Sequence, residues 1–251
     1  MKLALVMALV LSVAACGGPN ASFAPAASDD FADVPGIGST RIDVPRPSGA
    51  AAPTCEPLGR GPADDETTVE RVAALRKLGF FAGRSETDAA LAVTINEQSI
   101  AEFGTEPDPE DPISELVIAG VDDARVWWGD LEADVDPSNK VYESTLEAWA
   151  GISRGAFAPS GITETWASPT GPVTVSLTLN GKPETLKPAY LEDWIDPTII
   201  TRINELIAST GKQFELYRAF DQTLFLTVLT AAEKRTLERD RGWCFEWPAT
   251  G

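Results

Sequence analysis

The segment from Val173 to Tyr190 constrains the fold of this chain most, because it predicts two strands joined by a tight turn. Its first arm, VTVSLTLN, alternates apolar and polar residues without a break, which is typical of a strand buried on one face. Asn180 and Gly181 readily adopt the positive φ angles of a type I′ turn. With that turn Leu186 falls opposite Val175, so we expect an antiparallel hairpin against a hydrophobic core.

Residues 64–104 predict a helical subregion. Apolar residues recur at three-residue spacing from Val69 to Leu78, and Gly79 follows as a stop signal, which indicates an amphipathic helix. Ser85–Asp88 is a helix start signal for a second helix. The passage GTEPDPEDP, residues 104–112, predicts a loop.

Residues 75–83, LRKLGFFAG, resemble the start of the small peptidoglycan-binding helical repeat found in cell-wall enzymes. Thr87, Ala89 and Ala90 extend the resemblance, but the second glycine-rich turn of that repeat is missing between Gly83 and Thr87. We recognise no family for the folded part as a whole.

Strand and helix signals alternate through the rest of the chain. Strands are predicted at residues 116–121, 125–135, 162–168, 214–217, 223–229 and 242–247. Helices are predicted after Asp136-Pro137 and Asp196-Pro197, and Thr230 to Glu233 forms a capping box for a last helix. This order predicts a single α+β domain over residues 64–251, with a mainly antiparallel sheet and helices packed on one face.

The N-terminus predicts export. Lys2 precedes an apolar run from Leu3 to Val13 that is too short to span a bilayer as a helix, so residues 1–15 are expected to be a signal peptide. The segment then ends in Val-Ala-Ala-Cys at residues 13–16.

These residues resemble a bacterial lipoprotein signal with its lipobox, in which the invariant cysteine corresponds to Cys16. The resemblance covers residues 1–17. It implies a diacylglycerol on the Cys16 thiol and a further acyl chain on its amine, which together give stable membrane anchoring in the cell envelope. The alternative is an ordinary secretory signal cut after Ala15.

Residues 16–63 predict a lipidated cysteine followed by a flexible tether. Residues 17–63 hold eight of the 19 prolines, and Gly, Ala and Ser fill most of the rest. If the segment is mobile from Gly17 to Thr54, its root-mean-square reach is roughly 35 Å. The folded domain could then stand clear of its membrane.

Cys55 and Cys244 lie near the two ends of the folded part and are the remaining thiols besides Cys16. An exported chain meets an oxidising compartment, so a disulfide between them is predicted. It would contribute at most roughly 5 kcal/mol to stability by the chain-entropy model. The alternative is two separately buried thiols.

The chain is acidic and contains no histidine. Its net charge is −18, and removal of Lys2 with the signal peptide would make it −19. Such a surface repels phosphate backbones, so nucleic acid is not expected as a partner, whereas a basic protein or peptide is attracted. Without histidine, Ser-His and Cys-His catalysis and His metal ligands are excluded.

Acidic residues alternate in GDLEADVDPSN, where Asp130, Glu132, Asp134 and Asp136 would share one face of a strand. The row is expected to be a solvated strand face, a weak cation site or a basic-partner site. Its spacing does not fit a calcium-binding EF-hand loop, because Pro137 replaces the required glycine. Trp127 and Trp128 are adjacent and are expected to point to opposite sheet faces.

Two functions remain. The anchor, the tether, the charge and the lack of a recognisable catalytic set favour a binding module for a basic protein or peptide, such as an inhibitor, immunity-type or assembly partner, with no cofactor. The alternative is a carboxylate-based carbohydrate hydrolase using Asp130, Glu132, Asp134 and Glu164, or a carbohydrate-binding envelope protein. A purely structural envelope protein has no feature in its favour.

Overall fold

The computed structural model describes residues 65–109, 111, 113–220 and 223–247. Within these residues the helices are α1 Thr68–Lys77, α2 Asp88–Phe103, α3 Ser114–Gly120, α4 Val141–Ile152, α5 Ile199–Ile207, the short 3-10 helix η3 Ala208–Thr210 and α6 Ala231–Asp240. The strands are β1 Val126–Asp130, β2 Ser160–Trp166, β3 Val173–Leu179, β4 Lys182–Leu186, β5 Lys212–Phe220, β6 Thr223–Thr230 and β7 Phe245–Trp247.

The strands form two antiparallel sheets, which confirms the predicted α+β class. The central sheet has the order β1-β6-β5-β7, and the smaller sheet has the order β2-β3-β4. Strand β6 is buried from Thr223 to Leu229, because its alternate residues pack into two different hydrophobic clusters. Leu226 belongs to one cluster and Phe225 to the other.

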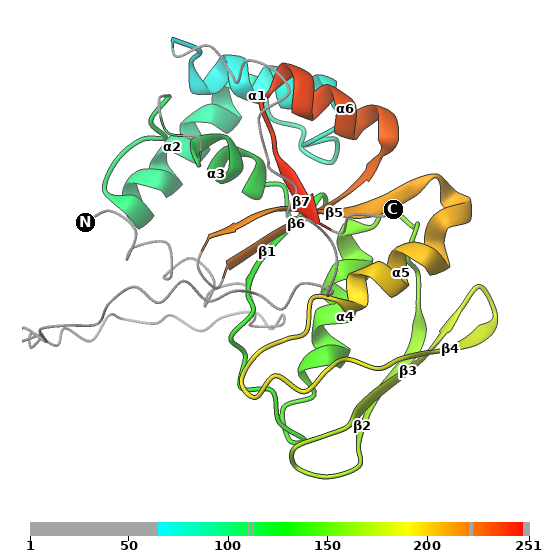
Figure 1. Ribbon diagram of the computed structural model, residues 1–251. Helices are drawn as coiled ribbons and strands as arrows, with labels where there is room; N and C mark the ends of the chain where they lie inside the picture. Colours follow the sequence, from blue (N-terminus) through cyan, green and yellow to red (C-terminus); the bar gives the residue numbers. More distant parts are fainter. Residues whose placement is uncertain (1–64, 110, 112, 221–222, 248–251) are drawn as a thin grey trace, which may run out of the picture.

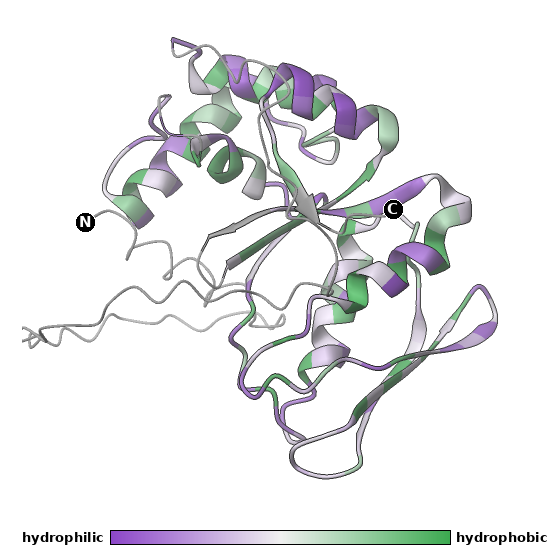
Figure 2. Cartoon of the chain, viewed as in Figure 1, coloured by the Kyte–Doolittle hydropathy of each residue, from purple (hydrophilic) through white to green (hydrophobic). Residues whose placement is uncertain are grey.

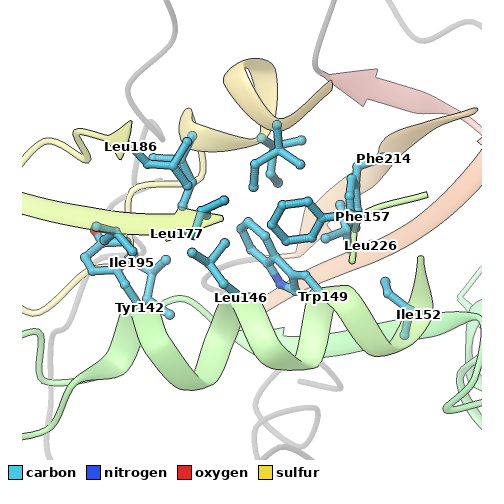
Figure 3. Close-up of a cluster of buried hydrophobic side chains, with 14 of the residues drawn as sticks. Tyr142, Leu146, Trp149, Ile152, Phe157, Leu177, Leu186, Ile195, Phe214 and Leu226 are labelled. Carbon is cyan, nitrogen blue, oxygen red and sulfur yellow. The ribbon is translucent and has the colours of Figure 1, made fainter. Parts of the chain in front are cut away.

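The central sheet is therefore covered by helices on both faces (Figure 1), whereas the sequence predicted helices on one face. Helices α1, α2, α3 and α6 cover one face, whereas α4, α5 and the smaller sheet cover the other. Figure 3 shows Tyr142, Leu146, Trp149 and Ile152 pointing from α4 into the second of these cores. Helix α6 is largely hydrophilic, as its colour in Figure 2 shows.

The smaller sheet contains the predicted hairpin. Leu186 pairs with Val175 across β3 and β4, as expected, and Asn180 and Gly181 have φ angles of 52° and 75°. The inward side of β3 is buried in the core, while Ser176 on its outer side is exposed. This sheet thus has one covered face and one polar face.

Two predicted strands differ from the structure. Residues 114–120 form helix α3 instead of the strand predicted at 116–121, because a short apolar run fits a buried helix as well as a strand. Strand β1 ends at Asp130 rather than Val135. The Asp130 carboxylate accepts a hydrogen bond of 2.8 Å from the Glu132 amide, and this local turn ends the strand.

Helix boundaries depend on side-chain caps. The predicted box from Thr230 to Glu233 caps α6, and Thr67 with Glu70 forms an equivalent box on α1. By contrast, α4 begins at Val141, after a left-handed Lys140, and not directly after Asp136-Pro137. The Asp136 carboxylate accepts hydrogen bonds from Ser138, so it forms a turn before the helix.

Candidate functional site

A groove of about 290 Å³ lies where α1, α2 and the loop after α2 meet. Its lining includes Glu66, Val69, Arg71, Val93, Asn96 and Glu106. The predicted helical subregion of residues 64–104 therefore supplies two walls, and the predicted loop at 104–112 supplies the third.

The two helices are held together by side chains at their ends. Thr67 caps α1, and Arg76 near its end donates hydrogen bonds to the carbonyls of Phe81, Arg84 and Glu86 in the connection to α2. Arg76 Nε also donates to Asp88 at 2.6 Å. One guanidinium thus fixes the entry of α2 relative to α1.

The third wall is fixed from below by Arg71, which is only 3% exposed. Its Nη2 donates to the Pro109 carbonyl at 2.9 Å, and its Nε donates to the Glu66 carbonyl at 3.2 Å. The Ser99 hydroxyl, which α2 contributes, holds the Thr105 carbonyl at 2.8 Å. The loop is therefore attached to both helices.

Beneath the groove lies a buried ionic cluster. Arg241 binds Glu115 through two hydrogen bonds of 2.7 and 2.8 Å, and its Nη1 donates to Glu66 Oε1 at 2.9 Å. Arg71 Nη1 lies 3.8 Å from Glu115 Oε2. Burial alone would lower the pKa of Arg241, but its hydrogen bonds to Glu115 and Glu66 raise it above its ordinary value. Two cations thus balance two anions.

The two helices of the groove carry exposed apolar side chains, of which Val69 and Val93 line the groove itself. The large hydrophobic residues that the described part exposes are Val69, Val93 and Ile100, at 40%, 57% and 47%. Ala89, Val93 and Ile100 follow one side of α2 at helical spacing. Single exposed apolar residues are ordinary, but here all three belong to the pair of helices that forms the groove.

The surroundings of the groove are acidic. Residues 65–111 contain eleven acidic and four basic side chains, a net charge of −7 on less than a fifth of the chain. Glu106 lines the groove and is exposed, and the exposed Glu97 follows Val93 by one helical turn. The site can therefore attract positive charge to an apolar surface.

A larger hollow of about 430 Å³ lies along α6. Its lining in the described part comes from that helix alone, with Arg235, Thr236, Glu238 and Arg239 among the residues. A surface with one described wall and mixed charges indicates no particular ligand, so the groove between α1 and α2 is the better candidate.

The acidic row lies elsewhere. Glu132 and Asp134 are exposed and belong to the segment after β1, so the four predicted carboxylates do not share a strand face. Buried residues still alternate with the carboxylates, because Leu131 follows Asp130 and Val135 precedes Asp136, and both are buried. Among the described residues there is no group of three or more His, Cys, Asp or Glu side chains that could hold a metal ion.

Glu164 has a structural role. It is 8% exposed, and its two oxygens accept hydrogen bonds from the Tyr142 amide at 2.8 Å and the Trp166 indole at 2.6 Å. The carboxylate thus caps the start of α4. Trp127 and Trp128 pack into the two different cores, which confirms that they point to opposite faces.

The predicted signal peptide at residues 1–15, Cys16, the tether and Cys55 lie outside the described residues. Cys244 is described and partly buried, but its predicted disulfide with Cys55 remains a prediction. In the part of the chain that is described, no helix is both long and apolar enough to cross a membrane.

Comparison of the chain with protein-family models, with curated proteins and with solved structures found no match in any of the three.

Proposed function

We propose that this domain is a membrane-tethered acidic binding module, which holds a basic and partly apolar segment of another protein outside the cytoplasm. The observation that carries the proposal is the groove between α1 and α2, where Val69 and Val93 are exposed beside Glu97 and Glu106. Burying apolar surface gives affinity, while the acidic surroundings select positive partners and speed their approach. The Cys16 anchor and its tether would keep the module at the envelope.

A direct test measures fluorescence anisotropy of a labelled peptide of alternating leucine and arginine, with a leucine–glutamate peptide for comparison. We expect the arginine peptide to bind, the glutamate peptide not to bind, and added salt to weaken binding. Equal affinity for both peptides, or an affinity that does not change with salt, would contradict the proposal that the acidic surface attracts a basic partner.

A pair of variants locates the interaction. Val93→Asp places a charge in the apolar wall and should weaken binding about tenfold or more, since burying an unpaired charge is unfavourable. Ala148→Asp adds the same charge to an exposed position of α4 and should change affinity little. Equal effects of both variants would place binding elsewhere on the domain.

The hydrolase alternative has no supporting observation. Neither hollow described above is lined by Asp130, Glu132 or Asp134, and the two oxygens of Glu164 accept hydrogen bonds from the Tyr142 amide and the Trp166 indole.

A further inference from the structure

The predicted tether, residues 17–63, joins the domain beside the groove. The groove lining begins at Glu66, and the described part of the chain begins one residue earlier. Arg241 donates a hydrogen bond of 2.9 Å to Glu66. Cys244 follows Arg241 by three positions, so the predicted disulfide with Cys55 would also hold the tether near the groove. A segment of the tether can therefore reach back to this surface.

The tether contains a basic and partly apolar segment at residues 41–46, RIDVPR. The segment has two arginines and one aspartate, whereas residues 17–40 have three aspartates and no cation, and residues 56–60 hold one glutamate for one arginine. Ile42 and Val44 are two positions apart, so their side chains lie on the same side of an extended backbone. The proline after Val44 favours such a backbone.

The groove complements this segment. Val69 and Val93 in its lining are exposed, and contact with Ile42 and Val44 would remove this apolar surface from water. Glu106 in the lining, together with the acidic residues around it, would attract the two arginines. A volume of about 290 Å³, at the lower end of the range for ligand pockets, suits the side chains of a short extended segment.

A second copy of the chain is a less favourable occupant. The surroundings of the groove, residues 65–111, have eleven acidic and four basic side chains, so two copies that face each other here would repel. Residues 41–46 meet attraction instead.

The connection to the groove is short. Residues 47–65 link the segment to Glu66, and a flexible chain of these 19 residues has a root-mean-square reach of roughly 24 Å. The segment and the groove then meet at an effective concentration on the order of 1 mM. A segment with an intrinsic Kd of about 0.2 mM would fill the groove most of the time and weaken a competing peptide about sixfold.

Resting on the proposed function, we propose that residues 41–46 of the same chain occupy the groove when no partner is bound. Ile42 and Val44 contact its apolar walls. Arg41 and Arg46 lie toward its acidic surroundings. A partner has to displace this segment, so its apparent affinity is lowered in proportion to the fraction of chains whose groove is free.

The test compares the full mature chain with two double variants of the tether. Ile42→Ser with Val44→Ser removes the apolar contacts of the segment, and Val34→Ser with Ile37→Ser makes the same change elsewhere in the tether. Neither double variant alters the charge. We expect the first to bind the labelled leucine–arginine peptide about sixfold more tightly than the parent, and the second to bind it equally. The backbone NMR resonances of the groove should move in the first variant alone.

A synthetic peptide of residues 39–48 supplies a direct check. Added to the chain with Ile42→Ser and Val44→Ser, it should restore the groove resonances of the parent with a Kd on the order of 0.2 mM. The same peptide with the two serines should not. A further Val93→Asp in that chain should abolish the effect, whereas Ala148→Asp on α4 should not.

The outcomes separate the internal contact from the proposed function. Equal peptide affinity in all three chains, or an equal gain in both double variants, would overturn the internal contact and leave the binding module standing. Groove resonances that depend on protein concentration, and not on the tether substitutions, would indicate a second copy in the groove and would also overturn it. If the resonances respond to the first double variant but no leucine–arginine peptide binds, the contact stands and the proposed function is wrong.

Discussion

Arg241, the C-cap residue directly after α6, binds Glu115 of α3 through Nε at 2.7 Å and Nη2 at 2.8 Å, although 126 positions separate them in the chain. Their side chains are only 7% and 4% exposed. The pair joins the end of α6 to α3, and the hydrogen bond from Arg241 to Glu66 connects it to the lining of the groove.

Removing one partner of this pair should strongly destabilise the folded domain. Arg241→Met leaves the Glu115 carboxylate buried without its main partner, so we expect the free energy of unfolding to fall by about 3–5 kcal/mol. Chemical denaturation measures the loss. Arg241→Met combined with Glu115→Leu removes both charges and should recover at least half of it. A single variant within about 1 kcal/mol of the parent would contradict this prediction.

Glu233 predicts an acid-dependent loss of stability. Burial alone would raise its pKa, but hydrogen bonds from Arg154 and Thr230 lower it from 4.5 to about 2. Because the folded pKa is the lower one, this contribution is fully present above the unfolded pKa and is lost as the pH falls through the folded pKa. Denaturation of the parent and of Glu233→Gln should therefore differ at neutral pH and converge between about pH 5 and about pH 2. A stability difference between the two proteins that stays constant over that range would show that the Glu233 carboxylate is not the source of the pH dependence.

Gly129 predicts a steric effect on a neighbouring tryptophan. A methyl group on Gly129 would overlap the indole of Trp127, which packs edge-on against Trp149 at 5.8 Å between ring centroids. Gly129→Ala should cost about 1–3 kcal/mol and change the tryptophan fluorescence.

Gly151→Ala is the matched control. Nothing lies within 4 Å of the added methyl group in this helical position, so stability should stay equal or rise by about 1 kcal/mol. If both alanine variants changed stability equally, packing against Trp127 would not explain why residue 129 is a glycine.

Local signals allowed several parts of the fold to be predicted. The hairpin register follows from strict alternation and from Asn180-Gly181, and the α6 cap follows from Thr230 and Glu233, which are three positions apart. These features depend on neighbours in sequence. The class of the domain followed from them, whereas the covering of both faces of the central sheet depends on how distant segments pack.

The groove could not be predicted, because its properties arise from tertiary contacts. The spacing of Val69 with the buried Val72 and Leu75 suggested a core position, yet Val69 is 40% exposed. Asn96 gave no signal, since the lack of a hydrogen-bond donor near its buried oxygen is a result of tertiary packing. The second apolar side of α2, with Ala89, Val93 and Ile100 at helical spacing, is the sequence feature that could have indicated this surface.

The predicted membrane anchor depends on chemistry that only Cys16 supplies. If Cys16 is acylated, the mature protein should partition with membranes and its N-terminal peptide should carry acyl mass. Cys16→Ala should remove this modification. Because the tether is expected to bury little, the same change should leave the thermal midpoint of the folded domain unchanged.

Cys244→Ala is the contrasting variant, since it removes one end of the predicted disulfide and not the anchor. It should lower the thermal midpoint while the protein still partitions with membranes. An unmodified Cys16 at the N-terminus of a freely soluble mature protein, found by mass spectrometry, would overturn the lipoprotein assignment. A secreted domain, without attachment to the envelope, would then present the groove between α1 and α2.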